Sequence, residues 1–362
     1  MNSEATAAPQ CWRDARNLKV LGMGTALPGP PVTTSELLER IEKRFGVAIS
    51  RRGTKFADRL KIESRHICRS FDSRHEVPRP GHSNPDLAAA ALRGALEEAQ
   101  LKIGDLAYLI GHTTSPACLV PPNIALVADL LGFTGPYMEL RQACTGFANA
   151  LVIAQGLASV RGPRAVGIVG SETGSVYFDP ARAGEDVSQL VNLVQMGDGA
   201  AAIVVAPDDS RPGSRISSNF FGQIGVGRES GFTLADGGSD RPFIARGALE
   251  FVHDFASLRV SGAELFEKGA AVARALGIGV DVADHVIPHQ VNGHMAELLG
   301  AHFGIEPRRV FVNADRLGNT GSAAMWLALA ELRPSLEPGA SVLALGAEAT
   351  KYMFGGFSYV HG

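Results

Sequence analysis

Residues 143–151 read ACTGFANAL, and residues 318–327 read GNTGSAAMWL. The triplet that begins at Cys144 corresponds to the triplet that begins at Asn319, and a run of small residues typical of a helix follows each one. Short matches can arise by chance, so the surrounding sequence has to support the correspondence. If it does, the chain contains an internal repeat that decides its fold.

The residues upstream of the two triplets correspond as well. Thr114 lies thirty positions before Cys144, at the end of the strand-like run AYLIGHTT. His289 lies thirty positions before Asn319, near the end of the strand-like run DHVIPHQ. Between these points, DLLGFTG in the first half parallels AHFGIEP in the second. The ordered recurrence predicts two copies of one α/β unit.

Strand-like and helix-like runs alternate from residue 18 to the end, which predicts an α/β fold with covered sheets. The polar segment 208–215, DDSRPGSR, contains Pro and Gly and is the predicted boundary between the halves. We therefore predict a loose tail over residues 1–16, a first half over 17–207 with the cysteine, and a second half over 208–362 with the histidine and the asparagine.

Composition and charge exclude several classes of function. The 362 residues are 45% hydrophobic and 20% charged, and the net charge of −3 argues against binding to nucleic acid. No run is long and apolar enough to span a membrane, and we expect no secretory signal at the N-terminus. The four cysteines show no CxxC pair or disulfide pattern, which favours reduced thiols in the cytoplasm.

Duplication explains why a cysteine stands at a strand-to-helix junction. If the halves pack about a pseudo-twofold axis, equivalent junctions meet near that axis, and Cys144, His289 and Asn319 converge. A thiolate at a helix N-terminus is stabilised by free backbone N–H groups, and a nearby imidazole can accept its proton. The amide of Asn319 and the imidazole of His289 offer two donors that could hold an enolate oxygen.

Four motifs in order, ACTGF, MGDGAAA, IPHQVN and RLGNTGSAA, resemble those of the β-ketoacyl-acyl carrier protein synthase III family of the thiolase superfamily. The resemblance runs from about residue 17 to the C-terminus. It implies a thiolase-like duplicated αβαβα layered fold and a homodimer without metal or organic cofactor. It also implies that Cys144 accepts an acyl group from a coenzyme A or carrier-protein thioester. His289 and Asn319 would then promote decarboxylation of a malonyl-type thioester.

The sequence departs from the family where the oxyanion hole is expected. Relatives that prime fatty-acid synthesis carry a glycine-rich stretch, but residues 346–356 read GAEATKYMFGG. The resemblance implies that a backbone N–H near Thr350 pairs with the N–H of Cys144 in this role.

The expected substrate entrance departs from the family too. We expect Arg59, Asn292 and His294 to contact the substrate, although Lys55 replaces a stacking aromatic residue and His294 replaces a basic one. These differences favour a carrier-protein donor over coenzyme A. Val120, in SPACLVPPN, stands where a phenylalanine often closes the acyl pocket of the partner subunit, and this loop carries no glutamate base.

Simpler interpretations exist for single residues. A cysteine before a helix is more often structural than catalytic, and Asn319 alone could be a turn or N-cap residue. His289 and His294 lack the spacing and the further ligands of a metal site, and GMGTALP lacks the third glycine of a dinucleotide loop. The matched repeat positions of Cys144, His289 and Asn319, within the four motifs, favour catalysis over these interpretations.

Three functions fit the motifs: a decarboxylative condensing enzyme, an acyltransferase that passes the acyl group to an alcohol or amine, and a non-catalytic subunit of a heterodimeric synthase. The presence of Cys144, His289 and Asn319 together argues against the non-catalytic subunit, which need not keep all three. Asn319 favours condensation, because simple acyl transfer needs no enolate donor. The departures favour specialised fatty-acid or polyketide metabolism.

Overall fold

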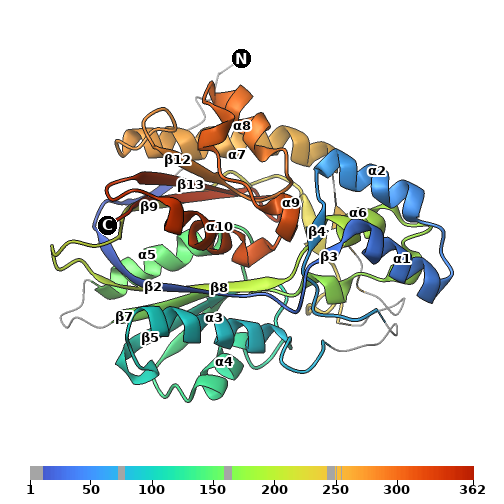
Figure 1. The fold of residues 1–362 in the computed structure, drawn as a ribbon, viewed down its shortest axis with the longest axis horizontal. Helices are drawn as coiled ribbons and strands as arrows, with labels where there is room; N and C mark the ends of the chain where they lie inside the picture. Colours follow the sequence, from blue (N-terminus) through green and yellow to red (C-terminus); the bar gives the residue numbers. More distant parts are fainter. Residues whose placement is uncertain (1–10, 72–77, 159–164, 243–248, 250, 254) are drawn as a thin grey trace.

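The computed structural model describes residues 11–71, 78–158, 165–242, 249, 251–253 and 255–362. Within these residues, ten strands join in one hydrogen-bonded sheet, in the order β12-β13-β14-β9-β2-β8-β7-β5-β6, with β1 on β9. Figure 1 shows that the sheet folds over into two layers, one for each half of the chain.

The first half contributes five strands, in the spatial order β2 (Leu18–Ala26), β8 (Gly199–Pro207), β7 (Ala165–Glu172), β5 (Leu106–His112) and β6 (Tyr137–Leu140). The pairs β2–β8 and β8–β7 are antiparallel, whereas β7–β5 and β5–β6 are parallel.

The second half repeats this arrangement with β9 (Arg215–Gln223), β14 (Met353–Val360), β13 (Ser341–Glu348) and β12 (His285–Pro288). The pairs β9–β14 and β14–β13 are antiparallel, and β13–β12 is parallel. A parallel bridge from Val286 to Val310 takes the place of the last strand. The predicted duplication is therefore confirmed strand by strand.

Helices cover both layers and fill the space between them, which gives five layers in the predicted αβαβα order (Figure 1). The outer layers are α3 (Asn84–Glu98) with α4 (Asn123–Leu131), and α7 (Phe255–Ala275) with α8 (Met295–Phe303). The central layer is α5 (Gly146–Ala158) with α10 (Ala324–Leu332).

Other elements gather beside the layers. They are α1 (Thr34–Phe45), α2 (Ser50–Leu60), α6 (Val187–Gln195), α9 (Ala314–Leu317), the antiparallel pair β3 (Val32–Thr33) and β4 (Ser64–Arg65), and the antiparallel pair β10 (Phe232–Leu234) and β11 (Phe251–His253). Short 3-10 turns occupy residues 103–105, 174–177, 180–182, 307–309, 321–323 and 333–335.

Local sequence signals explain several helix ends. The side chains of Thr33 and Ser83 each accept the N–H three residues on, from Glu36 and Asp86, and those carboxylates accept the cap N–H in return. Such reciprocal caps satisfy N–H groups that a helix leaves unpaired. Gly46 ends α1 with φ of 67°, a conformation that glycine adopts without strain.

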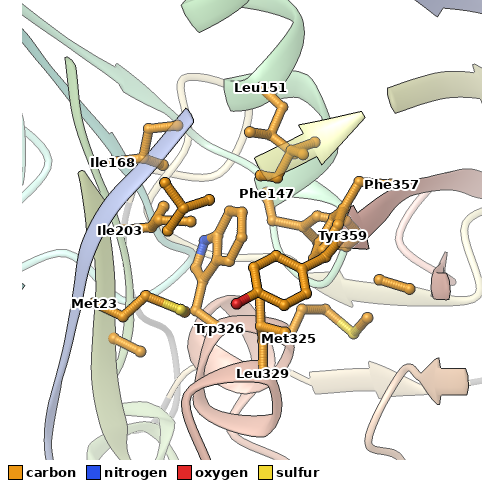
Figure 2. Packing of buried hydrophobic residues seen from close by; sticks show 14 of the residues in the cluster. Met23, Phe147, Leu151, Ile168, Ile203, Met325, Trp326, Leu329, Phe357 and Tyr359 are labelled. Carbon is orange, nitrogen blue, oxygen red and sulfur yellow. The ribbon is translucent and has the colours of Figure 1, made fainter. Parts of the chain in front are cut away.

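Aromatic side chains lock the central layer (Figure 2). The rings of Phe147 on α5 and Trp326 on α10 lie edge to face at 5.9 Å, and Phe357 on β14 stacks on Trp326 at 5.4 Å. All three side chains are buried. Because α5 begins at the last residue of the first triplet and α10 begins three residues after the second, this packing fixes the two junctions relative to each other.

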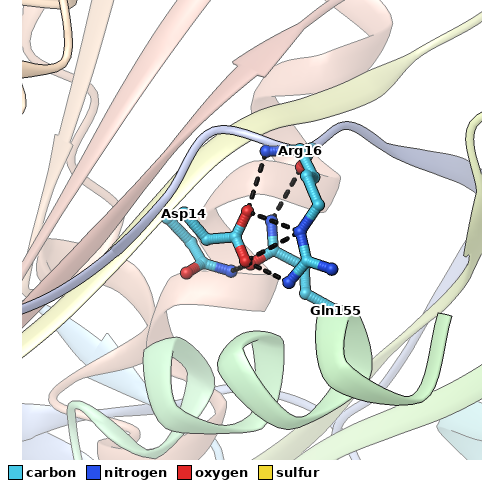
Figure 3. Close-up of polar contacts among 4 residues, drawn as sticks. Asp14, Arg16 and Gln155 are labelled. Carbon is cyan, nitrogen blue, oxygen red and sulfur yellow. Dashed lines mark hydrogen bonds and ion pairs between the residues drawn. The ribbon is translucent and has the colours of Figure 1, made fainter. Parts of the chain in front are cut away.

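The predicted loose tail is wrong over Cys11–Asp14, which form β1 and pair antiparallel with residues 219–222 of β9. The reason is an open edge on β9. Because β2 pairs with β9 only at residues 215 and 216, the backbone groups further along this edge of β9 are free to pair with β1. Figure 3 shows the tie that follows: the backbone N–H of Arg16 donates to the Asp14 carboxylate at 2.9 Å, and Gln155 donates to the Arg16 carbonyl at 2.8 Å. Residues 1–10 lie outside the described residues.

The predicted boundary segment, residues 208–215, lies where the chain passes from the first half to the second. Residues 208–214 link the end of β8 at Pro207 to the start of β9 at Arg215. Because Leu18 of β2 pairs with Ile216 of β9, the halves share one sheet, and their division into domains stays a prediction. Among the described helices, none is long and apolar enough to cross a membrane.

Candidate active site

The three residues that the repeat predicts to converge lie on one cavity of about 200 Å³. Cys144, His289 and Asn319 all line it, and Thr350 does so as well. Apolar side chains such as Leu265 form other parts of the wall. The structure thus brings together residues that are far apart in the sequence, whereas their catalytic roles stay predictions.

Cys144 lies at the predicted strand-to-helix junction, between the end of β6 at Leu140 and the start of α5 at Gly146. Gly146 is required there, because a Cβ atom on it would lie 2.6 Å from Nδ1 of His112. His112 is buried and its Nε2 accepts a hydrogen bond from Nε1 of Trp326 at 3.2 Å. Tight packing against His112 therefore fixes where α5 begins and where the thiol stands.

Asn319 lies between α9 and α10 and is held by its own backbone and side chain. Its N–H donates to the Gln195 carbonyl at 2.8 Å, and its carbonyl accepts from the N–H of Gly197 at 3.1 Å. Its side-chain Oδ1 accepts from the N–H of Gly321 at 3.0 Å. With Oδ1 occupied, the Nδ2 amide is the part of the side chain that remains to donate a hydrogen bond.

His289 directly follows β12, and its N–H donates to the carbonyl of Leu345 on β13 at 2.8 Å. The side chain is buried, and its Nδ1 has no hydrogen-bond partner within the described part of the chain. Burial lowers the pKa of His289 to about 4. The imidazole is therefore neutral at pH 7, so that one ring nitrogen donates and the other accepts.

Two buried glutamates on the same cavity were not predicted from the sequence. Glu348 accepts the N–H of Thr145 at 3.0 Å, and Glu172 accepts the N–H of Ser322 at 3.2 Å. A signal was present, because the strand-like runs AVGIVGSE and SVLALGAE both end in a glutamate. The internal repeat thus extends to a pair of acidic residues.

The electrostatics at Cys144 differ from the sequence-based expectation. Burial raises the pKa of the Cys144 thiol well above its ordinary value, and the charges of Glu348 and Glu172 raise it further. The expected stabilisation of the thiolate at the start of α5 is therefore wrong for this structure. Burial is the larger physical reason. The second is the Glu348 carboxylate, which accepts the Thr145 N–H and so occupies the positive end of the helix.

The predicted oxyanion-hole residue stands in the turn between β13 and β14. The Thr350 hydroxyl donates to the Glu348 carboxylate, and the same carboxylate accepts the N–H of Thr145 from the turn that carries Cys144. The two turns therefore lie side by side. The role of the Thr350 backbone N–H stays a prediction.

The other residues expected to contact the substrate, Arg59, Asn292 and His294, are not among those that line this cavity, although Asn292 directly follows Val291 of the lining. Arg59 is exposed on α2, and Asn292 accepts the N–H of His294 at 2.9 Å at the start of α8. The structure brings these two places close together, because the N–H of Gly293 donates to the carbonyl of Leu60 at the end of α2. Their contacts with a substrate stay predictions.

Val120 also lies away from the lining of the cavity. Its side chain is 84% exposed in the single chain. Among the described residues, no cluster of three or more histidine, cysteine, aspartate or glutamate side chains could hold a metal ion.

Two family models match the chain: 3-oxoacyl-[acyl-carrier-protein (ACP)] synthase III over residues 138–225, and the C-terminal part of the same synthase over residues 273–353. The chain is 31% identical to a beta-ketoacyl-[acyl-carrier-protein] synthase III of Nitratidesulfovibrio vulgaris, over 75% of this chain and 82% of the relative. It is 30% identical to a 3-oxopimeloyl-[acyl-carrier-protein] synthase of Rhodothermus marinus, over 95% and 93% of the respective chains.

Similar solved structures include condensing enzymes of more than one kind. AbyA1, a tetronic acid condensing enzyme, superposes with a TM-score of 0.81 at 26% identity, over 95% of this chain and 99% of the other. The priming β-ketosynthase of the R1128 polyketide pathway superposes with a TM-score of 0.77 at 25% identity, over 96% and 97%.

Proposed function

Because the chain belongs to the β-ketoacyl-[acyl-carrier-protein] synthase III family, we propose that it is a decarboxylative condensing enzyme that is acylated at Cys144. A carrier-protein or coenzyme A thioester donates the acyl group, and a malonyl-type thioester supplies the carbon nucleophile. Specialised fatty-acid or polyketide metabolism is the proposed setting. The names of the similar enzymes AbyA1 and the R1128 priming ketosynthase support this setting.

One observation carries the proposal: a thiol, a neutral imidazole and an amide line a single cavity. Burial keeps His289 uncharged, and the Gly321 N–H fixes the orientation of the Asn319 amide. Two neutral donors near a thiol suit a reaction in which negative charge develops on an oxygen beside a stored acyl group.

In the first step, Sγ of Cys144 attacks the carbonyl carbon of the donor thioester. A new C–S bond forms while the bond to the donor sulfur breaks. Because the pKa of the thiol is raised, its proton leaves during the attack rather than before it. The neutral His289 imidazole accepts that proton and passes it to the departing thiolate.

In the second step, the malonyl-type thioester loses carbon dioxide, and the electron pair of the broken C–C bond becomes an enolate. N–H groups of Asn319 and His289 hold the enolate oxygen. The enolate carbon attacks the acyl carbon on Cys144 and the C–S bond breaks. The negative charge of the malonyl carboxylate is then on the Cys144 sulfur, which takes up a proton from solvent. Each donor binds negative charge that exists only during the reaction. Such a hydrogen bond is stronger in the transition state than in the bound substrate, and it therefore accelerates the reaction.

We also propose a homodimer in which the loop around Val120 shapes the acyl pocket of the partner subunit. The side chains of Leu119 and Val120 are 62% and 84% exposed. Apolar side chains at this exposure fit a surface that a second copy covers.

Mass spectrometry of the intact protein tests the first step. After incubation with a panel of acyl thioesters, we expect the acyl mass on the peptide that contains Cys144. A label on Cys11, Cys68 or Cys118, or a label that survives in Cys144→Ala, overturns the assignment. Transfer of the acyl group to an alcohol or amine, without carbon dioxide release from any malonyl donor, would establish the acyltransferase instead.

A further inference from the structure

Two buried glutamates occupy equivalent places in the two halves. Glu172 is the last residue of β7 and Glu348 is the last residue of β13, which are the corresponding strands of the repeated sheet. Their side chains are 2% exposed, and both line the cavity that holds Cys144. A buried carboxylate is expensive unless it is hydrogen-bonded, so the partners of each one indicate its role.

Glu348, from the second half, reaches the turn of the first half that carries Cys144. Its Oε2 accepts from the N–H of Thr145 at 3.0 Å and from the Thr145 hydroxyl at 2.7 Å. Its Oε1 accepts from the N–H of Ala143 at 3.4 Å and from the Thr350 hydroxyl. The residues on both sides of Cys144 are therefore tied to one carboxylate.

Glu172, from the first half, reaches in the same way to the loop of the second half that carries Asn319. Its Oε2 accepts from the N–H of Ser322 at 3.2 Å and from the Ser322 hydroxyl at 2.9 Å. Its Oε1 accepts from the hydroxyls of Thr114 and Ser115. The contact is so close that a Cβ atom on Gly321 would lie 2.7 Å from the carboxylate.

We propose that Glu348 and Glu172 are reciprocal positioning residues, each of which crosses from one half of the fold to hold the reactive loop of the other. Glu348 positions Cys144 and keeps a fixed negative charge beside its thiol, and Glu172 positions Asn319. The inference deepens the proposed function, because it rests on Cys144 as the acyl-accepting residue.

The hydrogen bonds assign Glu348 to positioning rather than to proton transfer. Each carboxylate oxygen accepts from two donors in the structure, so the lone pairs that a general base would use are occupied. The charge still acts across the cavity: it contributes to the raised pKa of Cys144, second only to burial, and Glu172 contributes less.

The other titratable side chains on the cavity are His289, His253 and Tyr352, and no lysine or arginine lines it among the described residues. Among the described residues that line the cavity, none carries a positive charge that could neutralise Glu172 and Glu348. Removal of the Glu348 charge should therefore change the acidity of Cys144 directly.

The test is the pH dependence of Cys144 alkylation by iodoacetamide, followed by peptide mass spectrometry, which needs no thioester substrate. In the wild type, we expect an apparent pKa above the value of about 8.5 for a free thiol. Glu348→Gln should lower this apparent pKa by about one unit or more, which corresponds to about tenfold faster alkylation at neutral pH. Glu172→Gln should lower it less, because its charge contributes less.

Two further variants separate charge from positioning. Thr145→Val removes the hydroxyl that donates a hydrogen bond to Glu348 but keeps the carboxylate, so it should not lower the apparent pKa of Cys144. It should still slow self-acylation from a thioester about tenfold or more, because a small displacement of a reacting group lowers the rate of reaction steeply. Glu337→Gln, at an exposed position, should change neither quantity.

A wild-type apparent pKa at or below the free-thiol value overturns the proposal, and so does a Glu348→Gln profile equal to that of Glu337→Gln. If Glu348→Gln does not fold, the wild-type profile and Thr145→Val decide the question. Failure of the proposed function would show differently, as a wild-type Cys144 that is alkylated with the expected profile but never acylated by thioesters.

Discussion

Acid should destabilise this protein through His112, at the end of β5 beside the start of α5. The side chain is 1% exposed, and its Nε2 accepts from Nε1 of Trp326, which a protonated imidazole could not do. Burial lowers the pKa of His112 to about 3 from the ordinary value of 6.5. Between these two pH values the unfolded chain binds a proton at this residue and the folded chain does not.

The sign follows from the difference in bound protons. The stability due to neutral His112 is fully present above pH 6.5 and is lost as the pH falls towards 3. At pH 5 the loss relative to neutral pH is about 2 kcal/mol, on the way to about 5 kcal/mol below the folded pKa. Burial raises the pKa of Glu172 and of Asp198, and these groups add stability in the same range as the pH falls.

A matched variant isolates the imidazole from these opposing groups. Glutamine in His112→Gln can still accept the Trp326 N–H but does not titrate. We expect the free energy of unfolding in urea to fall by about 2 kcal/mol more for the wild type than for His112→Gln between pH 7.5 and pH 5. Tryptophan fluorescence follows the transition. Equal losses in the two proteins would refute the argument.

Three other predictions concern the acyl pocket, the imidazole and the core. Val120→Phe should shift acylation towards shorter acyl chains, measured by mass spectrometry with competing thioesters, because a ring fills space that valine leaves open. The control Val226→Phe, at another exposed position, should cause no such shift. A protein that is strictly monomeric in solution would contradict this prediction. Because burial lowers the pKa of His289 to about 4, carbon dioxide release should show no loss centred at pH 6.5, and such a midpoint would exclude a neutral buried imidazole. Phe147→Ala should lower the free energy of unfolding, measured in urea, by about 3–5 kcal/mol. A loss as small as that of Tyr137→Ala, at the surface, would mean that the aromatic core does not join the halves.

The sequence predicted the duplication and the convergence because both depend on order along the chain. Equivalent triplets at Cys144 and Asn319 follow equivalent strands, and a pseudo-twofold arrangement brings such points together. The β1 strand could not be predicted, since its formation depends on the free edge of β9, which only the completed sheet creates.

The acidic pair escaped prediction for a related reason. Glu172 and Glu348 end buried strands, but the partners that make them tolerable, Ser322 and Thr145, lie in the opposite half of the chain. Hydrogen bonds across a duplicated fold leave no local spacing to detect. Burial, and after it the charges of this pair, raise the pKa of the Cys144 thiol, which a helix N-terminus alone would have lowered.

The most direct test of the central claim measures carbon dioxide release from a labelled malonyl thioester beside mass spectrometry of the acyl-enzyme, in the wild type, in Asn319→Ala and in the exposed control Asn17→Ala. We predict that all three proteins become acylated at Cys144, that the control releases carbon dioxide like the wild type, and that Asn319→Ala releases it about 10²–10³-fold more slowly, because one preorganised donor to the enolate is lost. Normal decarboxylation by Asn319→Ala would contradict the role of the amide, and a wild type that never releases carbon dioxide from any malonyl donor would contradict condensation itself.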